Sequence, residues 1–360
     1  MNWILSGKTN PGTMETTLEL IILGRGNAWP VPLGEEHPFY DRTDPIDLSN
    51  AAFSLQIREA EGRMASVLVD AGHGTVQSLL AGDNRIPDSI CLTHGHLDHT
   101  LSVDWVVQSY WRGPRKEKRY PIYATLPVYR FLLQAYPQLE VPTEHRELEF
   151  GVAIPPGGEM PFRLTPFPVY HGQSAVGAAM LLFGYGNRKV LFTGDMLVPL
   201  LRKEDYEQLR GVDLLVVDSN NRFPWPRTNH WSFAGSPEDP LKRSKELEIL
   251  ANGLSLEQAL RPHLHEGISD NNLSYLSGLE REWVATEAPL TILEFLERIR
   301  PRRVVLVHYS GTEDRKHHGQ EILDPAGLQA WVSETARTAG FPGEIVVPEN
   351  RQRIQIELHG

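Results

Sequence analysis

Short apolar runs recur along the chain, and many of them end at a Gly, Asp or His. Residues 53–57 alternate between apolar and polar positions, which is typical of a half-buried strand, whereas residues 214–217 form the continuous run of a fully buried one. On these grounds we expect strands at residues 18–23, 53–57, 66–69, 90–92, 122–124, 180–183, 190–192, 214–217, 304–307, 344–347 and 354–357, with two more within residues 147–171.

Helical periodicity fills several of the intervals between these runs. Residues 128–136 follow Pro127, which suits the first turn of a helix. Residues 184–187, Gly-Tyr-Gly-Asn, predict the turn of a hairpin between two of the strands. The expected helices cover residues 75–81, 101–111, 128–136, 290–298 and 325–338.

The most informative polar residues follow the run at 90–92, in the heptad Thr93-His94-Gly95-His96-Leu97-Asp98-His99. Three imidazoles and one carboxylate fall within six positions, and both groups are ligands of zinc, manganese and iron. Gly95 permits a sharp turn, so that His94 and His96 can converge while Asp98 and His99 turn towards a second point. The alternative is a polar loop that is merely rich in histidine, but it would not explain the further candidate ligands that follow later in the chain.

Three single residues follow later runs in a matching order. His171 ends one run, Asp195 follows Gly194 after the run at 190–192, and His308 ends the run at 304–307. Together with the heptad, this ordered set resembles the signature of the metallo-β-lactamase superfamily, a group of metal-dependent hydrolases. The resemblance covers residues 18 to about 310.

The resemblance implies the fold class and the organisation of the chain. We expect an α/β (α+β) four-layer αβ/βα sandwich that forms a single domain over residues 17–360, behind a flexible lead-in at residues 1–16. Residues 220–288 are a long insertion, rich in aromatics, Pro, Asn and His, that is expected to act as a lid or substrate wall.

The resemblance also implies a set of ligands for two divalent cations, with zinc as the first choice and manganese or iron as alternatives. In that arrangement, His94, His96 and His171 hold one ion, Asp98, His99 and His308 hold the other, and Asp195 bridges them. A hydroxide shared by the ions would attack the substrate. Asp70 would support the ligand loop by hydrogen bonds.

Further residues are candidates for proton transfer or for additional sites. Asp98 is expected to serve catalysis besides its ligand role, and His230 and Asp218 are candidate proton donors. His230 has a surface histidine as its alternative. His263 and His265 have the spacing of metal ligands, although the core already supplies a full set, and His317 with His318 is expected to face solvent.

The substrate stays open among several classes. The turn at residues 24–30 and the residues around Asp218 resemble the ribonuclease Z and small-molecule phosphodiesterase branch, so a small organic phosphodiester is the first choice. Ribonuclease Z itself fits poorly, because the connection from His171 to Asp195 is too short for its tRNA-gripping arm. The alternatives are a carboxylic ester, lactone or amide, and a non-haem iron oxidoreductase. An inactive binding module is disfavoured because every expected ligand is there.

Composition narrows the partners and the compartment. The net charge of −11 argues against a broad basic surface and hence against nucleic acid, and the short basic stretch at residues 112–119 is expected to be a solvated loop. No apolar run approaches the roughly 18 residues that span a bilayer. The single cysteine fits a reducing cytoplasm. We expect a cytoplasmic enzyme of a small molecule, without a membrane partner and with a homodimer left open.

Overall fold

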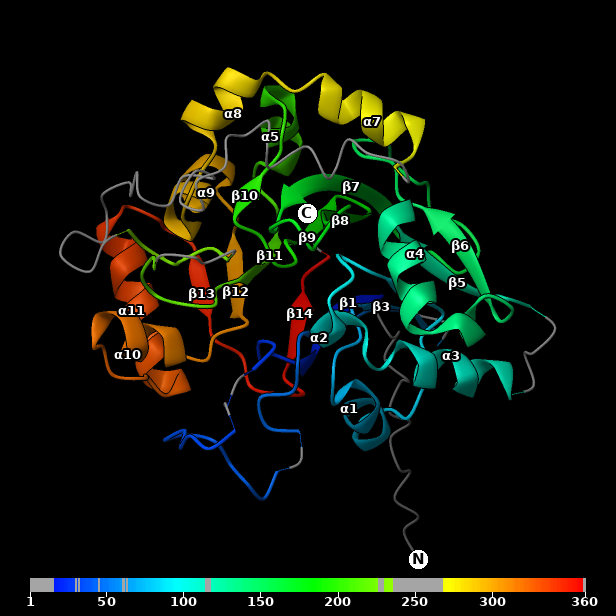
Figure 1. Ribbon diagram of the computed structural model, residues 1–360, viewed down its shortest axis with the longest axis horizontal. Coiled ribbons are helices and arrows are strands. Elements are labelled where there is room, and N and C mark those ends of the chain that lie inside the picture. Colours follow the sequence, from blue (N-terminus) through cyan, green and yellow to red (C-terminus); the bar gives the residue numbers. More distant parts are fainter. Residues whose placement is uncertain are drawn as a thin grey trace, which may run out of the picture.

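The structure is a computed structural model. It describes residues 16–358, apart from residues 30, 32, 45, 60–61, 63, 114–117, 226–229 and 236–267. Within this part of the chain, most of the predicted strands and helices are present, and they form two facing sheets with helices on the outside (Figure 1).

The first sheet contains the N-terminal strands and the last strand of the chain. Its order is β14-β1-β2-β3-β4-β5-β6, and the pairs from β3 to β6 are parallel. The strands are β1 (Thr17–Gly24), β2 (Ala52–Arg58), β3 (Met64–Val69), β4 (Ser89–Cys91), β5 (Tyr120–Ala124), β6 (Thr143–Glu147) and β14 (Arg353–Ile356).

The second sheet also contains both parallel and antiparallel pairs, and it is built from strands later in the chain. Its order is β10-β7-β8-β9-β11-β12-β13, and β9, β11, β12 and β13 are mutually parallel where they pair. The strands are β7 (Arg163–Tyr170), β8 (Ala179–Tyr185), β9 (Arg188–Phe192), β10 (Val198–Pro199), β11 (Leu214–Asp218), β12 (Arg303–Val307) and β13 (Glu344–Val346).

Helices cover the outer face of each sheet. The first sheet is covered by α1 (Thr75–Ala81), α3 (Val103–Trp111) and α4 (Leu126–Ala135), and the second by α5 (Lys203–Leu209), α9 (Ile292–Ile299) and α11 (Pro325–Thr338). The remaining helices are α2 (Leu97–Thr100), α7 (Asp270–Ser277), α8 (Arg281–Glu287), α10 (Thr312–His318) and the short 3-10 helix η1 (Pro137–Leu139).

The hydrophobic core divides into the three layers that this arrangement requires. One cluster lies between the sheets and includes Leu55 of β2 and Phe192 of β9. A second packs α1, α3 and α4 onto the first sheet, and a third packs α5, α9 and α11 onto the second. The four-layer αβ/βα sandwich of the metallo-β-lactamase fold is therefore confirmed.

Two segments depart from the predicted elements. The helix predicted over residues 101–111 is present as α3 but begins at Val103. The Ser102 N–H donates to Ala71 O at 2.8 Å and the Ser102 hydroxyl donates to Gly72 O at 2.6 Å, which separates α2 from α3. Of the two strands predicted within residues 147–171, the second is present as β7, which ends at Tyr170 just before His171. The first is not, because β6 ends at Glu147 and the residues between β6 and β7 contain Pro155-Pro156-Gly157-Gly158.

Other predictions concern the surface. The described residues of the basic stretch, Arg112, Lys118 and Arg119, are exposed as expected. His317 is exposed, but His318 is only partly so, because its Nε2 lies 2.6 Å from Pro224 O. No helix in the described ranges is long and apolar enough to cross a membrane.

The topology brings the functional loops to one place. The carboxyl ends of β3 and β4 in the first sheet and of β9, β11 and β12 in the second lie at the same edge of the sandwich, so that their loops meet. Figure 1 places α2, which begins within the ligand heptad, between the two halves of the molecule.

Candidate metal centre

The loop after β4 presents the heptad side chains in a fixed orientation. Asp70, which follows β3, accepts hydrogen bonds from the Thr93 N–H at 2.8 Å, from the Thr93 hydroxyl at 2.7 Å and from His99 Nδ1 at 2.8 Å. The backbone of Asp70 has φ 56°, a left-handed conformation that residues other than glycine adopt less often. The carboxylate thus supports the loop in the way that the family resemblance implies.

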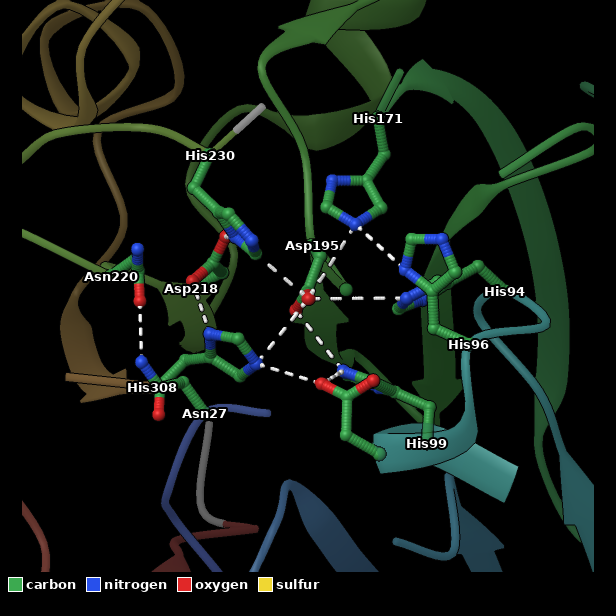
Figure 2. A network of polar contacts seen from close by, with 12 residues as sticks. Asn27, His94, His96, His99, His171, Asp195, Asp218, Asn220, His230 and His308 are labelled. Atoms are coloured by element: carbon green, nitrogen blue, oxygen red, sulfur yellow. Dashed lines mark hydrogen bonds and ion pairs between the residues drawn. The ribbon is translucent and has the colours of Figure 1, made fainter. Parts of the chain in front are cut away.

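The second sheet contributes single residues to the same volume. His171 follows β7, Asp195 follows β9 and His308 follows β12. Asp195 Oδ1 lies 3.2 Å from His99 Nε2, and its Oδ2 lies 3.3 Å from His308 Nε2, 3.7 Å from His171 Nε2 and 3.9 Å from His94 Nε2. Figure 2 shows Asp195 between imidazoles that come from both sheets.

The donor atoms form the two groups that the resemblance implies and a third, which overlaps with one of them and contains Asp195, Asp218, His230 and His308. In each group, the potential ligand atoms lie within 4.8 Å of one another. Of the two implied groups, one is His94, His96 and His171, and the other is Asp98, His99, Asp195 and His308. The structure therefore brings together all seven predicted ligands, and Asp195 contacts members of both groups.

The imidazoles are oriented as ligands of a cation would be. The Nε2 atoms of His94, His99 and His308 are buried and have no hydrogen-bond partner. Buried nitrogens of this kind are normally paired, so three of them near one carboxylate fit the ligand set of a cation.

The far side of each ring is held by a neighbouring side chain, which leaves the near nitrogen for a cation. His99 Nδ1 binds Asp70, and His94 Nδ1 lies 3.1 Å from the Thr93 hydroxyl. His308 Nδ1 lies 3.1 Å from Asp218 Oδ1. His96 has the opposite orientation: its Nε2 contacts the Ser174 hydroxyl at 3.0 Å, and its Nδ1 faces His171 Nε2 at 3.2 Å. The set of nitrogen and carboxylate donors fits divalent cations such as zinc, manganese or iron.

The charges of the buried side chains in the centre also fit a site for divalent cations. Burial lowers the pKa of His94 well below its usual value, which favours the neutral imidazole. Burial alone would raise the pKa of Asp195, but the nearby His308 and His99 outweigh it and hold that pKa well below its usual value. Burial and the same two imidazoles oppose each other at Asp98, whose pKa is lowered to about 2. Burial would lower the pKa of His99 and of His308, but the nearby carboxylates outweigh it, raising the first well above its usual value and the second to about 10. His94 and the ionised carboxylates are thus in the forms that bind metal ions, and a bound cation would replace the protons on His99 and His308.

His230 lies in the centre rather than on the surface. Its side chain is 15% exposed, and its Nδ1 lies 2.9 Å from Asp218 Oδ2. The ring stacks on His308 with centroids 5.1 Å apart and meets His171 edge to face at 4.7 Å. The alternative of a surface histidine was therefore wrong, and a role of His230 in proton transfer stays a prediction.

Asp218 lies between two imidazoles of the centre. Its buried carboxylate faces His230 Nδ1 with one oxygen and His308 Nδ1 with the other. Burial would raise the pKa of Asp218, but His230 and His308 outweigh it and lower that pKa. This geometry favours a carboxylate that orients the two imidazoles, and the predicted role of Asp218 as a proton donor stays a prediction.

The turn after β1 borders the centre, as the resemblance implies. The His308 N–H donates to Arg25 O at 2.6 Å, and the Asn27 amide donates to Asn220 Oδ1 at 2.7 Å (Figure 2). The pattern of apolar positions gave no sign of Asn220 or Ser174, since neither lies in a recognisable ligand motif. His263 and His265 lie outside the described residues.

Comparisons with known proteins agree with the fold and the site. Residues 65–240 match the profile of the Beta-lactamase superfamily domain. A diphosphatase of the PhnP family is 19% identical, with a TM-score of 0.58 over 95% of this chain and 98% of that one. Zinc-bound PqqB from Methylobacterium extorquens is 11% identical, with a TM-score of 0.56 over 94% and 100% of the chains. The short form of human tRNase Z is 14% identical, with a TM-score of 0.51 over 94% and 100%.

Two curated relatives match only in part. The Synechocystis protein sll0514 is 26% identical over an alignment of 216 residues that covers 54% of this chain and 35% of that protein. The endoribonuclease YSH1 of Yarrowia lipolytica is 27% identical over an alignment of 151 residues that covers 36% of this chain and 18% of that protein. The chain thus matches about a third of one relative and less than a fifth of the other.

Residues 65–240 match the Beta-lactamase superfamily domain, and the fold and the ordered ligand set agree with that match. The similar structures show the fold alone at these identities, and they include proteins named as a diphosphatase and as a tRNase.

Proposed function

We propose that this protein is a metal-dependent hydrolase of a small organic phosphodiester. The observation that carries the proposal is the meeting of seven donors from two sheets in two groups that share Asp195, with three buried Nε2 atoms directed at the space between them. The choice of a phosphodiester is supported by relatives that are named as a diphosphatase, a tRNase and an endoribonuclease.

The protein would hold one cation with His94, His96 and His171, and a second with the group of Asp98, His99 and His308, while Asp195 contacts both positions. Bound divalent cations would activate water for attack and stabilise the negative charge on the phosphoryl oxygens. We propose zinc as the native metal, with manganese and iron as the other metals to be tested. The protein's own contribution is to fix seven ligands in a buried volume.

His230 is the group that we propose to protonate the leaving oxygen. Asp218 accepts a hydrogen bond from His230 Nδ1 at 2.9 Å, so the proton that the ring can release is the one on Nε2. The ionised Asp218 also stabilises the imidazolium form that donates this proton. His230 brings one described residue of the insertion into the centre, and a lid role for the whole insertion at residues 220–288 stays a prediction.

The substrate class is tested by comparing esters on the metal-loaded enzyme. We expect turnover of bis(p-nitrophenyl) phosphate, loss of that activity with a chelator, and its recovery with zinc, manganese or iron. p-Nitrophenyl acetate and a lactone panel should be poor substrates. Turnover of a carboxylic ester by fully loaded enzyme that leaves the phosphodiester intact would overturn the proposal.

The role of His230 is tested by varying the leaving group. His230→Ala should lose about a hundredfold or more in kcat on an alkyl phosphodiester, because an alkoxide needs a proton to leave. The loss should be below about tenfold on bis(p-nitrophenyl) phosphate, whose leaving group is stable as an anion. The matched control is His317→Ala, at an exposed histidine that stacks on Trp225. Equal losses on both esters would exclude His230 as the proton donor.

A further inference from the structure

A further buried carboxylate, that of Asp314, makes its hydrogen bonds and its ion pair with residues other than the predicted ligands. Asp314 belongs to α10, and its side chain is 0% exposed. It accepts hydrogen bonds from the Arg222 N–H at 3.0 Å, from Arg222 Nε at 3.0 Å, from the Phe223 N–H at 3.3 Å and from the Tyr309 hydroxyl at 3.1 Å. A buried charge with this many aligned donors holds its partners in one geometry.

These donors come from the two loops that carry Asp218 and His308. Arg222 and Phe223 lie a few residues beyond Asp218 at the end of β11, and Tyr309 directly follows His308 at the end of β12. One carboxylate therefore fixes the distance between the loops. Arg222 is held on its other side as well, because its Nη2 donates to Glu321 O at 2.6 Å and its guanidinium lies 5.4 Å from the Trp331 ring centre.

The same loop continues by backbone hydrogen bonds to the segment that carries His230. The Phe233 N–H donates to Asn221 O at 3.0 Å, and the Ala234 N–H donates to Arg222 O at 2.9 Å. Asp314, Arg222 and the segment of His230 thus form a continuous chain of contacts.

We propose that Asp314 is a positioning residue for the proton transfer, which acts by holding Asp218 between His308 and His230. The inference rests on the proposed function, since it presumes that His230 protonates the leaving group. Catalytic groups must be held within about 0.5 Å of their working positions. A shift of the loop of Asp218 would lengthen its 2.9 Å contact with His230 and release the orientation of that ring.

The chain offers a matched control on the same strand. Asp213 directly precedes β11, so it lies at the end of the strand opposite to Asp218. Its carboxylate, 10% exposed, accepts hydrogen bonds from Arg188 Nη1 at 2.9 Å and from the Lys189 N–H at 2.9 Å. Asp213→Asn therefore removes a similar buried charge next to an arginine, but away from the metal centre.

The experiment compares Asp314→Asn with Asp213→Asn on an alkyl phosphodiester and on bis(p-nitrophenyl) phosphate. We expect Asp314→Asn to lose about tenfold or more in kcat on the alkyl ester and less than about threefold on the aryl ester, with its metal content unchanged. Asp213→Asn should lower the melting temperature and change both rates by the same factor. In a His230→Ala background, Asp314→Asn should add no further preference for the aryl ester.

Equal losses on the two esters for Asp314→Asn, or no loss in the folded variant, would overturn the inference. If the proposed function itself is wrong, His230→Ala will show no dependence on the leaving group. This result distinguishes that failure from a failure of the inference on Asp314. If Asp314→Asn does not fold, Tyr309→Phe removes a single donor to the same carboxylate and should show a weaker preference of the same sign. A folded Tyr309→Phe with identical losses on both esters would then count against the inference.

Discussion

The two sheets contribute to the metal centre in different ways. The first sheet supplies His94, His96, Asp98 and His99 from one loop, and Asp70 at the end of the neighbouring strand orients that loop. The second sheet supplies one residue from the end of each of three strands, His171, Asp195 and His308.

The two sets of ligands therefore differ in what positions them: nearby contacts for the first sheet, and the packing of distant strands for the second. The loop of the first sheet is oriented mainly by the three contacts of Asp70. The second sheet adds a hydrogen bond from the Ala179 N–H to Thr93 O at 2.8 Å and the contact of Ser174 with His96. The donors of the second sheet are placed only when β7, β9 and β12 are packed in register, and we propose that Asp314 adds a further constraint on two of the loops. Substitutions should therefore act differently in the two sheets.

The largest effect is expected at Asp195, where the two contributions meet. Asp195→Asn keeps the shape of the side chain but removes the charge that faces His99 and His308 at 3.2 and 3.3 Å. We expect a loss of about a thousandfold in kcat, the size of a lost electrostatic contact to the reacting centre. Metal analysis of the purified variant should find less bound metal than in the wild type. A variant with full metal content and full rate would show that the carboxylate is not shared between the sheets.

An intermediate effect is expected when the orienting groups of the two sheets are removed in turn. Asp70→Asn weakens three hydrogen bonds in the loop of the first sheet and should lower metal affinity by about 10- to 100-fold. Ser174→Ala removes a single contact to His96 from the second sheet and should cost about fivefold or less. Competition with a chromophoric chelator measures both affinities. Equal losses of metal affinity in the two variants would mean that Asp70 does not orient the ligand loop more strongly than Ser174 does.

The smallest effect is expected away from the centre, where α7 joins the halves. Asn272 of α7 lies 3.5 Å from Glu147 Oε1 at the end of β6, and Tyr275 of the same helix donates to Asp205 of α5. Burial raises the pKa of Glu147 from 4.5 to about 7. The folded protein thus binds this proton more tightly than the unfolded chain, and the contribution of Glu147 to stability falls as the pH rises from about 4.5 to about 7.

Glu147→Gln retains an oxygen for the Leu126 N–H, which donates to Glu147 Oε1 at 3.1 Å, but does not titrate. The variant should gain stability relative to the wild type between pH 5 and pH 8, by on the order of 1 kcal/mol. Urea unfolding of both proteins at the two pH values measures this difference. A difference that does not change with pH would exclude Glu147 as the titrating group.

The sequence was sufficient for the fold class because the ligand order is unusual and the buried strands are continuous apolar runs. The heptad was recognisable by itself, since its donors are close in sequence. His171 and His308, in contrast, would each be ordinary residues at strand ends, and only their order relative to the heptad and Asp195 indicated a shared site.

The roles of residues outside that order could not be predicted, because they depend on contacts between distant segments. Asp218 was expected to donate a proton, and only the structure shows that both of its oxygens face imidazoles. Asp314 lies in a charged segment that looks like a solvated surface, yet it is buried by Arg222, 92 positions away in the chain. His230 follows no apolar run, and its place is fixed by the fully buried Trp231 beside it.

Each of the two donor groups contains residues from both sheets. An ion that binds there gains contacts only when the sandwich is closed, so binding shifts the population from unfolded to folded chains by mass action. The survival of the protein among proteases should therefore depend on the free metal in its surroundings. A shortage of the ion would shorten its lifetime as well as stop its chemistry.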